Sequence, residues 1–128
     1  MRRILTLMAA IAVAVGPATK AAARSDVGSP KAAANQYELV VFEADGCIYC
    51  EVFRQQVVPL YTASSTSREV PLRFVNVSKS DETKMGISGA ITIAPTVVLL
   101  RDGREVNRIT GYTGPGNFMQ MVAWMLGR

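Results

Sequence analysis

Histidine is missing from all 128 residues of the chain, and cysteine occurs only at Cys47 and Cys50. A Cys–His hydrolase is excluded, because the general base that activates its nucleophile is missing. A tetrahedral zinc site would also lack its usual ligands, so we predict neither a metal site nor a cofactor. A Cu(I) carrier that binds the ion through both thiolates, with Met85 as a third soft ligand, remains an alternative.

Long apolar runs are also scarce. A membrane-spanning helix needs about 20 apolar residues, and the N-terminal apolar run is shorter than that. The N-terminal apolar run, residues 4–15, follows two arginines and is followed by small residues at 21–23 that offer a cleavage site. This order is typical of a secretory signal peptide. We therefore expect residues 1–23 to be a cleaved signal peptide that directs the protein to the periplasm. An uncleaved membrane anchor is the alternative.

The excess of positive charge belongs largely to that N-terminal segment. The chain has 14 basic and 10 acidic residues, and residues 1–23 hold three of the basic ones and none of the acidic ones. The remainder therefore has a net charge of about +1, and we expect no nucleic-acid partner. Residues 24–36 are predicted to be a flexible lead-in. Residues 37–128 are predicted to be one domain, which we expect to be a monomer.

Within that domain, strand patterns alternate with helix patterns. Strands are predicted at 37–42, 72–77, 96–100 and 105–110, and helices at about 47–61, 80–86 and from 115 onward. Pro59 is expected to kink or end the first helix, and 62–69 is expected to be a mobile polar loop. The order predicts an α/β fold with a mixed four-stranded sheet flanked by helices. Parallel crossovers would join the first strands, and a hairpin at Asp102-Gly103 would add an antiparallel edge.

The two cysteines stand where the first predicted strand passes into the first predicted helix. Cys47 would begin the helix, where unpaired N–H groups and the positive end of the macrodipole favour a thiolate. Cys50 would lie one turn further on the same face, within reach of a disulfide. A structural staple is the alternative, but so short a ring gives only about 2 kcal/mol of loop entropy. We therefore interpret the pair as a redox dithiol.

A second motif, Ala94-Pro95-Thr96, opens the third predicted strand and precedes the Asp102-Gly103 turn. Together with the dithiol it resembles the thioredoxin superfamily over roughly residues 37–126. The short lead-in gives a minimal layout that is similar to glutaredoxin. Short stretches, namely Phe42-Glu43, Gly46-Cys47, Tyr49-Cys50 and Asp102-Gly103-Arg104-Glu105, resemble the small periplasmic thioredoxins encoded with sulfur-oxidation (Sox) systems.

The resemblance implies a thioredoxin-like fold and a thiol–disulfide oxidoreductase. It also implies that Pro95 is cis and lies against the dithiol, where Ala94 offers its backbone groups to the substrate. Ile48, Tyr49 and Thr96 are the other expected substrate contacts. Thioredoxin's buried aspartate corresponds to Val41 here, so that proton acceptor is missing.

Our hypothesis is that Cys47 attacks an oxidised cysteine of a partner protein and that Cys50 resolves the mixed disulfide. Glu43 could accept the proton of Cys50, or it could be an exposed solvated carboxylate. Acidic residues near the dithiol disfavour a thiolate and indicate a reductant rather than a strong oxidant. The resemblance implies a membrane thiol–disulfide electron donor and a sulfur-oxidation carrier as candidate substrate. A thiol oxidase or isomerase on the same fold remains the alternative.

Overall fold

The computed structural model describes residues 36–128. The predicted signal peptide and all of the predicted lead-in except Gln36 lie outside the described residues. None of the helices within 36–128 is long and apolar enough to cross a membrane.

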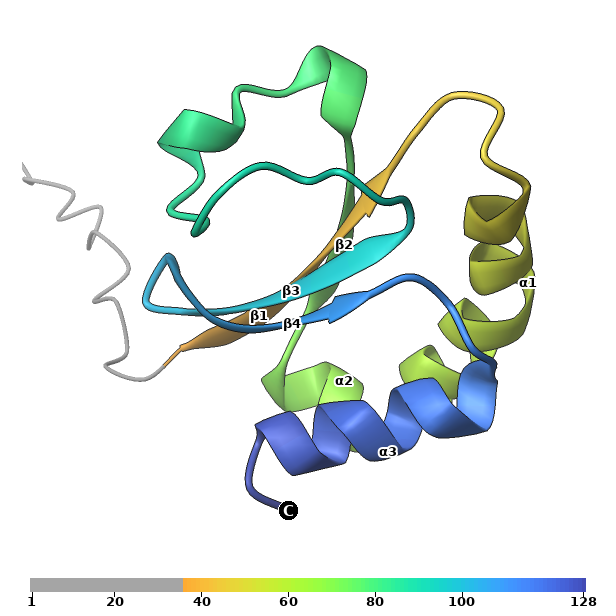
Figure 1. The fold of residues 1–128 in the computed structure, drawn as a ribbon. Helices are drawn as coiled ribbons and strands as arrows, with labels where there is room; N and C mark the ends of the chain where they lie inside the picture. The colour runs from red at the N-terminus through yellow and green to blue at the C-terminus, as the bar shows by residue number, and fades with distance from the viewer. Residues whose placement is uncertain (1–35) are drawn as a thin grey trace, which may run out of the picture. The chain divides into compact units, whose positions relative to one another are not determined.

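Four strands form one mixed sheet in the order β2-β1-β3-β4 (Figure 1). Their bounds are Tyr37–Glu43 for β1, Leu72–Asn76 for β2, Thr96–Arg101 for β3 and Arg104–Thr110 for β4. The predicted mixed four-stranded sheet is confirmed, and β1 and β2 are parallel as expected. However, β3 runs antiparallel to β1. Glu43 pairs with Asn76 and Phe42 with Thr96, so the chain enters β3 at the same end of the sheet at which it left β2.

Helix α1, Ile48–Ala63, is longer than the sequence suggested because it continues through Pro59. Of the two outcomes expected at Pro59, a kink or an end of the helix, the end is therefore wrong. Proline removes only one donor from the helix ladder, whereas burial of Tyr61 in the next turn keeps the chain helical. The Tyr61 hydroxyl donates a hydrogen bond to the backbone oxygen of Val70 over 2.6 Å. Leu60, the apolar residue between Pro59 and Tyr61, is 53 % exposed.

The predicted loop at 62–69 is also largely helical. Its residues form the end of α1 and a short helix α2, Thr66–Glu69. The Ser64 hydroxyl and backbone N–H both bond to the carbonyl of Tyr61, and the Val70 N–H bonds to the carbonyl of Thr66. These local bonds satisfy the backbone groups that a disordered loop would leave to water.

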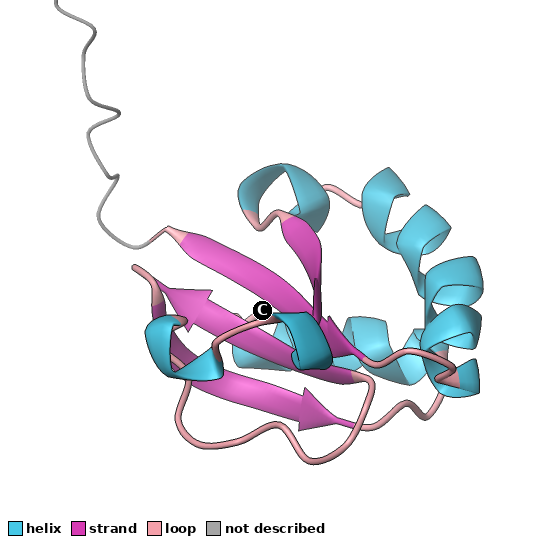
Figure 2. Cartoon of the chain, turned by 90° about the horizontal axis from the view of Figure 1, so that it is seen from above, coloured by secondary structure: helices cyan, strands magenta, loops and turns pink. Residues whose placement is uncertain are grey.

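Both faces of the sheet are covered, as Figures 1 and 2 show. Helices α1 and α3, the latter spanning Pro115–Met125, pack with alternate residues of the strands into one apolar cluster. The other cluster contains Val40, Phe42, Val98 and Leu100 and is covered by the segment between β2 and β3. Burial of both faces explains why the two central strands, β1 and β3, contain continuous apolar runs.

The segment between β2 and β3 contains two single-turn 3₁₀ helices, η1 at Val77–Lys79 and η2 at Glu82–Lys84. The sequence predicts one helix here, at about residues 80–86. Instead Asp81 caps η2, because its carboxylate accepts the backbone N–H of Thr83 over 3.2 Å. The rest of the segment runs across the sheet without regular structure and leads to Pro95.

Candidate active site

The site lies where β1 ends and α1 begins. Gly46 has a φ of +71° in the connecting turn, a conformation that glycine adopts without strain. Cys47 follows as the N-cap of α1, with extended backbone angles, and Ile48 is the first helical residue. The prediction that Cys47 stands at a helix N-terminus is therefore confirmed.

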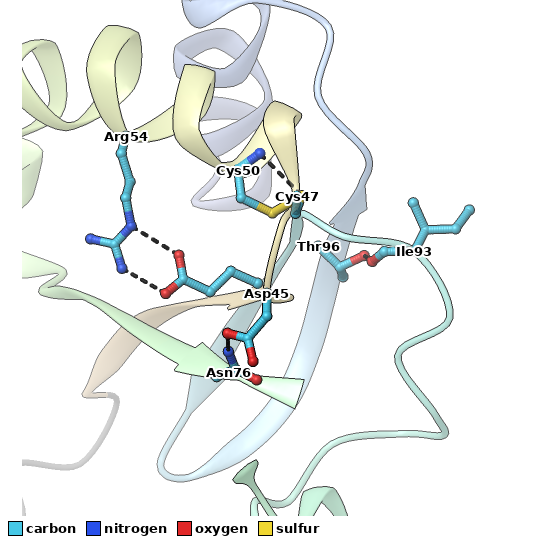
Figure 3. Close-up of a disulfide and its surroundings, with 8 residues drawn as sticks. Asp45, Cys47, Cys50, Arg54, Asn76, Ile93 and Thr96 are labelled. Carbon is cyan, nitrogen blue, oxygen red and sulfur yellow. Dashed lines mark hydrogen bonds and ion pairs between the residues drawn. A yellow bond between two sulfur atoms is a disulfide. The ribbon is translucent and has the colours of Figure 1, made fainter. Parts of the chain in front are cut away.

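Cys47 and Cys50 form a disulfide across the first turn of α1, with 5.3 Å between their Cα atoms (Figure 3). The Cys50 backbone N–H donates a hydrogen bond to the Cys47 sulfur over 3.2 Å. The two cysteines differ in exposure: Cys50 is buried, at 4 %, whereas Cys47 is only half-buried. A partner sulfur can therefore reach Cys47 more easily than Cys50.

The loop before β3 meets the dithiol end of the sheet. The Ala94–Pro95 peptide bond is cis, as the resemblance implied. Because Thr96 is the residue that pairs with Phe42, Pro95 and Ala94 lie at the level of the turn that carries the cysteines. The Pro95 carbonyl accepts a hydrogen bond from Gly111, and Thr96 is buried with its hydroxyl bonded to the carbonyl of Ile93. The structure thus brings together both sequence motifs.

Glu43 lies at the end of β1 and is held by Arg54 of α1. The guanidinium donates two hydrogen bonds to the carboxylate, over 2.9 and 2.7 Å, and this contact raises the pKa of Arg54. Arg54 also stacks on the ring of Phe74, 3.6 Å from its centroid. Both oxygens of Glu43 are thus engaged. The proton-acceptor role for Cys50 stays one of the two alternatives that the sequence leaves open for Glu43.

The sequence interpretation missed Arg54 and Asn76. No local sequence pattern links Arg54 to Glu43, which lies eleven positions earlier. Asn76 donates a hydrogen bond to the Asp45 carboxylate over 2.7 Å. The sequence could have indicated this contact, because neighbouring parallel strands end at the same edge of a sheet. Asn76 at the end of β2 is the register partner of Glu43 at the end of β1.

Exposed apolar side chains stand between the two cysteines in the sequence and shortly before Pro95. Ile48 and Tyr49, between the cysteines, are 68 % and 63 % exposed, and Ile93, two residues before Pro95, is 52 % exposed. The substrate contacts predicted at Ile48 and Tyr49 are thus accessible, whereas Thr96 is buried.

Met85 does not join the cysteines. It packs into the second apolar cluster, and the next residue, Gly86, lies against Gly103 in the β3–β4 hairpin. That hairpin is at the opposite end of β1 from the dithiol, because Arg101 pairs with Tyr37. Seven strand residues span roughly 20 Å, so a Cu(I) site with Met85 as third ligand does not fit. Within residues 36–128 there is also no group of three or more Cys, Asp or Glu side chains that could hold a metal ion.

Comparison with known proteins agrees with this geometry. Residues 31–125 match the family described as thioredoxin-like domain. The chain is similar to the crystal structure of the reduced periplasmic thioredoxin SoxS from Paracoccus pantotrophus, with 27 % identity and a TM-score of 0.66. That alignment covers 71 % of this chain and 96 % of SoxS.

Other solved structures show the same fold at lower similarity. Trxlp from Edwardsiella tarda EIB202 is 26 % identical with a TM-score of 0.53, covering 70 % of this chain and 84 % of that one. Mitochondrial thioredoxin 3 from Saccharomyces cerevisiae is 22 % identical with a TM-score of 0.55, covering 69 % and 77 %. No curated protein sequence matches the chain.

The family match spans about three quarters of the chain and includes both cysteines and Pro95. Its Cys-x-x-Cys pair is joined at the N-terminus of α1, in the position where a dithiol exchanges with other disulfides. The chain therefore belongs to the thioredoxin-like family and is a thiol–disulfide oxidoreductase.

Proposed function

We propose that the protein is a periplasmic reductant that restores an oxidised cysteine on a partner protein. The observation that carries this proposal is the unequal exposure of the two cysteines, since Cys47 is half-buried and Cys50 is 4 % exposed. An accessible sulfur at a helix N-cap suits the nucleophile, and a buried one a turn later suits the resolving thiol.

In the reduced enzyme, the Cys47 thiolate attacks one sulfur of the partner disulfide. The partner's S–S bond breaks, its second sulfur leaves as a thiolate and takes a proton, and Cys47 is joined to the partner. Cys50 then loses its proton and attacks the Cys47 sulfur, which releases the partner's other thiol. Two electrons have moved to the partner, and the enzyme is left with the disulfide seen in Figure 3.

The charges around the dithiol favour a reductant. A strongly oxidising dithiol needs a highly stabilised thiolate, usually through a nearby cation or imidazolium. This chain has no histidine, and the guanidinium of Arg54 is engaged by Glu43. The acidic residues Asp45 and Glu51 flank the pair instead. The helix N-terminus is then the main source of thiolate stabilisation.

The compartment and the partner are the finer parts of the proposal. The signal-like sequence at residues 1–23 and the similarity to periplasmic SoxS support export to the periplasm. In that oxidising space the enzyme must receive two electrons for each turnover, for which we propose a membrane thiol–disulfide donor. A cysteine-bearing carrier of sulfur oxidation is our candidate substrate.

The reduction potential of the Cys47–Cys50 couple tests the direction of electron flow. Equilibration of the protein with dithiothreitol or glutathione buffers should give a value closer to thioredoxin, about −270 mV, than to the strong periplasmic oxidant DsbA, about −120 mV. The reduced protein should also reduce insulin disulfides, and Cys47→Ser should abolish that activity. A potential near −120 mV would overturn the assignment as a reductant.

A further inference from the structure

An ion pair on β4 holds the chain segment that leads to Pro95. We call residues 86–94 the approach loop. Arg108 donates to the carboxylate of Glu105 through Nε over 2.5 Å and through Nη2 over 2.7 Å. The Glu105 side chain is only 8 % exposed, and its bonds to Arg108 hold the pKa of that carboxyl below its ordinary value. The pair is therefore a fixed ionic anchor.

This anchor binds both backbone groups of Ser88. The Ser88 N–H donates to Oε2 of Glu105 over 2.6 Å, and the Ser88 carbonyl accepts from Nη2 of Arg108 over 3.2 Å. The backbone N–H of Glu105 also donates to the carbonyl of Gly86 over 2.9 Å. Because β4 is an edge strand, these bonds fasten the approach loop along its outer side.

Two further contacts fix the loop on either side of Ser88. Gly86 passes so close to the β3–β4 hairpin that a Cβ atom there would lie 2.0 Å from the carbonyl oxygen of Gly103. The carboxylate of Glu82 accepts the backbone N–H of Ile91 over 3.1 Å. Ile91 is the last of these anchored residues before the loop reaches Ile93 and Ala94.

Apolar packing alone would hold the loop weakly. Ile87 and Ile91 are partly buried against the second apolar cluster, but residues 88–90, 92 and 93 are exposed. Segments with few buried contacts open easily, so polar bonds have a large share in keeping them ordered. The loop nevertheless has to present Ala94 at the dithiol end of the sheet.

We propose that Glu105 and Arg108 are positioning residues that hold the approach loop ready for a protein substrate. They would thereby set the affinity for protein substrates and leave the rate of sulfur exchange unchanged. This rests on the proposed function and on the substrate contact that the resemblance implies for the backbone of Ala94. No hydrogen bond within residues 36–128 joins either side chain to the cysteines, so their influence passes through the loop.

The size of the effect follows from the population of the ordered loop. If the released loop adopts the docking conformation about a tenth to a third of the time, the apparent affinity falls by about three- to tenfold. A small disulfide has no main chain to pair with the loop, so its reaction with Cys47 should be unaffected.

Glu105→Ala tests the proposal, with Glu38→Ala as a matched control. Glu38 also pairs with an arginine, Arg73, over 2.5 Å, but it does so between β1 and β2. Glu105→Ala should raise the KM for insulin by about three- to tenfold, with kcat and the rate with hydroxyethyl disulfide within about twofold of wild type. Glu38→Ala should change none of these. Equal KM values for the two variants, or an equal loss on both substrates, would overturn the proposal.

Amide hydrogen exchange gives a readout that needs no activity. The Ser88 amide should exchange about tenfold faster in Glu105→Ala, the factor expected for one lost hydrogen bond, and no faster in Glu38→Ala. Unchanged Ser88 exchange would overturn the proposal.

A wild-type protein that cannot reduce insulin would refute the proposed function, while faster Ser88 exchange in Glu105→Ala would still support positioning of the loop. If Glu105→Ala does not fold, Glu82→Ala should show the same KM rise and faster exchange at Ile91.

Discussion

Replacing Tyr61 with phenylalanine is expected to lower the free energy of unfolding by about 1–3 kcal/mol. The Tyr61 side chain is 2 % exposed, and its hydroxyl donates to the Val70 carbonyl over 2.6 Å. The substitution removes the donor and leaves the buried Val70 carbonyl without a hydrogen-bond partner. An unsatisfied buried acceptor costs its full desolvation penalty, which is more than the net contribution of a typical hydrogen bond. The same bond ties α1 beyond Pro59 to Val70, the residue that follows α2, so it supports the helix whose N-terminus carries the dithiol.

The effect should depend on pH with a defined sign. Burial raises the pKa of Tyr61 from 10.0 to about 12. A group whose pKa is higher in the folded state stabilises fully below its unfolded pKa, and this contribution is lost as the pH rises through the folded value. The difference between wild type and Tyr61→Phe should therefore be largest below pH 10 and shrink between pH 10 and about 12.

Urea denaturation of both proteins measures this difference, and Tyr112→Phe is the matched control. The Tyr112 hydroxyl donates to Gln56 over 2.9 Å at an exposed site, where water can replace it. Its loss should cost less than about 1 kcal/mol. Equal costs for the two substitutions, or a cost for Tyr61→Phe that grows above pH 10, would refute the reasoning.

Three further predictions concern backbone fit, charge and chemistry. Gly86→Ala should cost at least about 2 kcal/mol in urea denaturation, because the new Cβ would clash with Gly103; a loss below about 0.5 kcal/mol would contradict that close approach. Arg108 lowers the pKa of Glu105 from 4.5, so the stability difference between wild type and Glu105→Ala should shrink as the pH falls through the lowered value, and a difference unchanged at pH 3 would contradict this. Glu43→Gln should reduce the rate of insulin reduction by less than about tenfold, because Arg54 already engages both oxygens; a loss of about 100-fold or more would identify Glu43 as the proton acceptor.

The sequence predicted the strands and the dithiol well because those signals are local. Buried strands such as β1 contain an unbroken apolar run, here residues 39–42, and the Asp102-Gly103 turn separates β3 from β4. The spacing of Cys47 and Cys50 also requires no tertiary information. The resemblance added the cis peptide bond at Pro95, which neither composition nor periodicity predicts.

Long-range contacts account for the rest. Pro59 usually ends a helix, but burial of Tyr61 and its bond to Val70 favour continuation. The contact of Glu43 with Arg54 links a strand end to a helix face, and the bond of Ser88 with Glu105 spans seventeen residues. These contacts depend on the relative placement of elements, so neither hydrophobic periodicity nor turn residues could predict them.

Trapping of the mixed disulfide tests the central claim most directly. Cys50→Ser removes the resolving thiol, so a partner protein should remain attached through Cys47, and mass spectrometry of the reducible adduct would identify both the sulfur and the protein. We predict that Cys50→Ser accumulates this adduct on oxidised exported proteins and that Cys47→Ser does not. Accumulation through Cys50 in Cys47→Ser, with none in Cys50→Ser, would contradict the account.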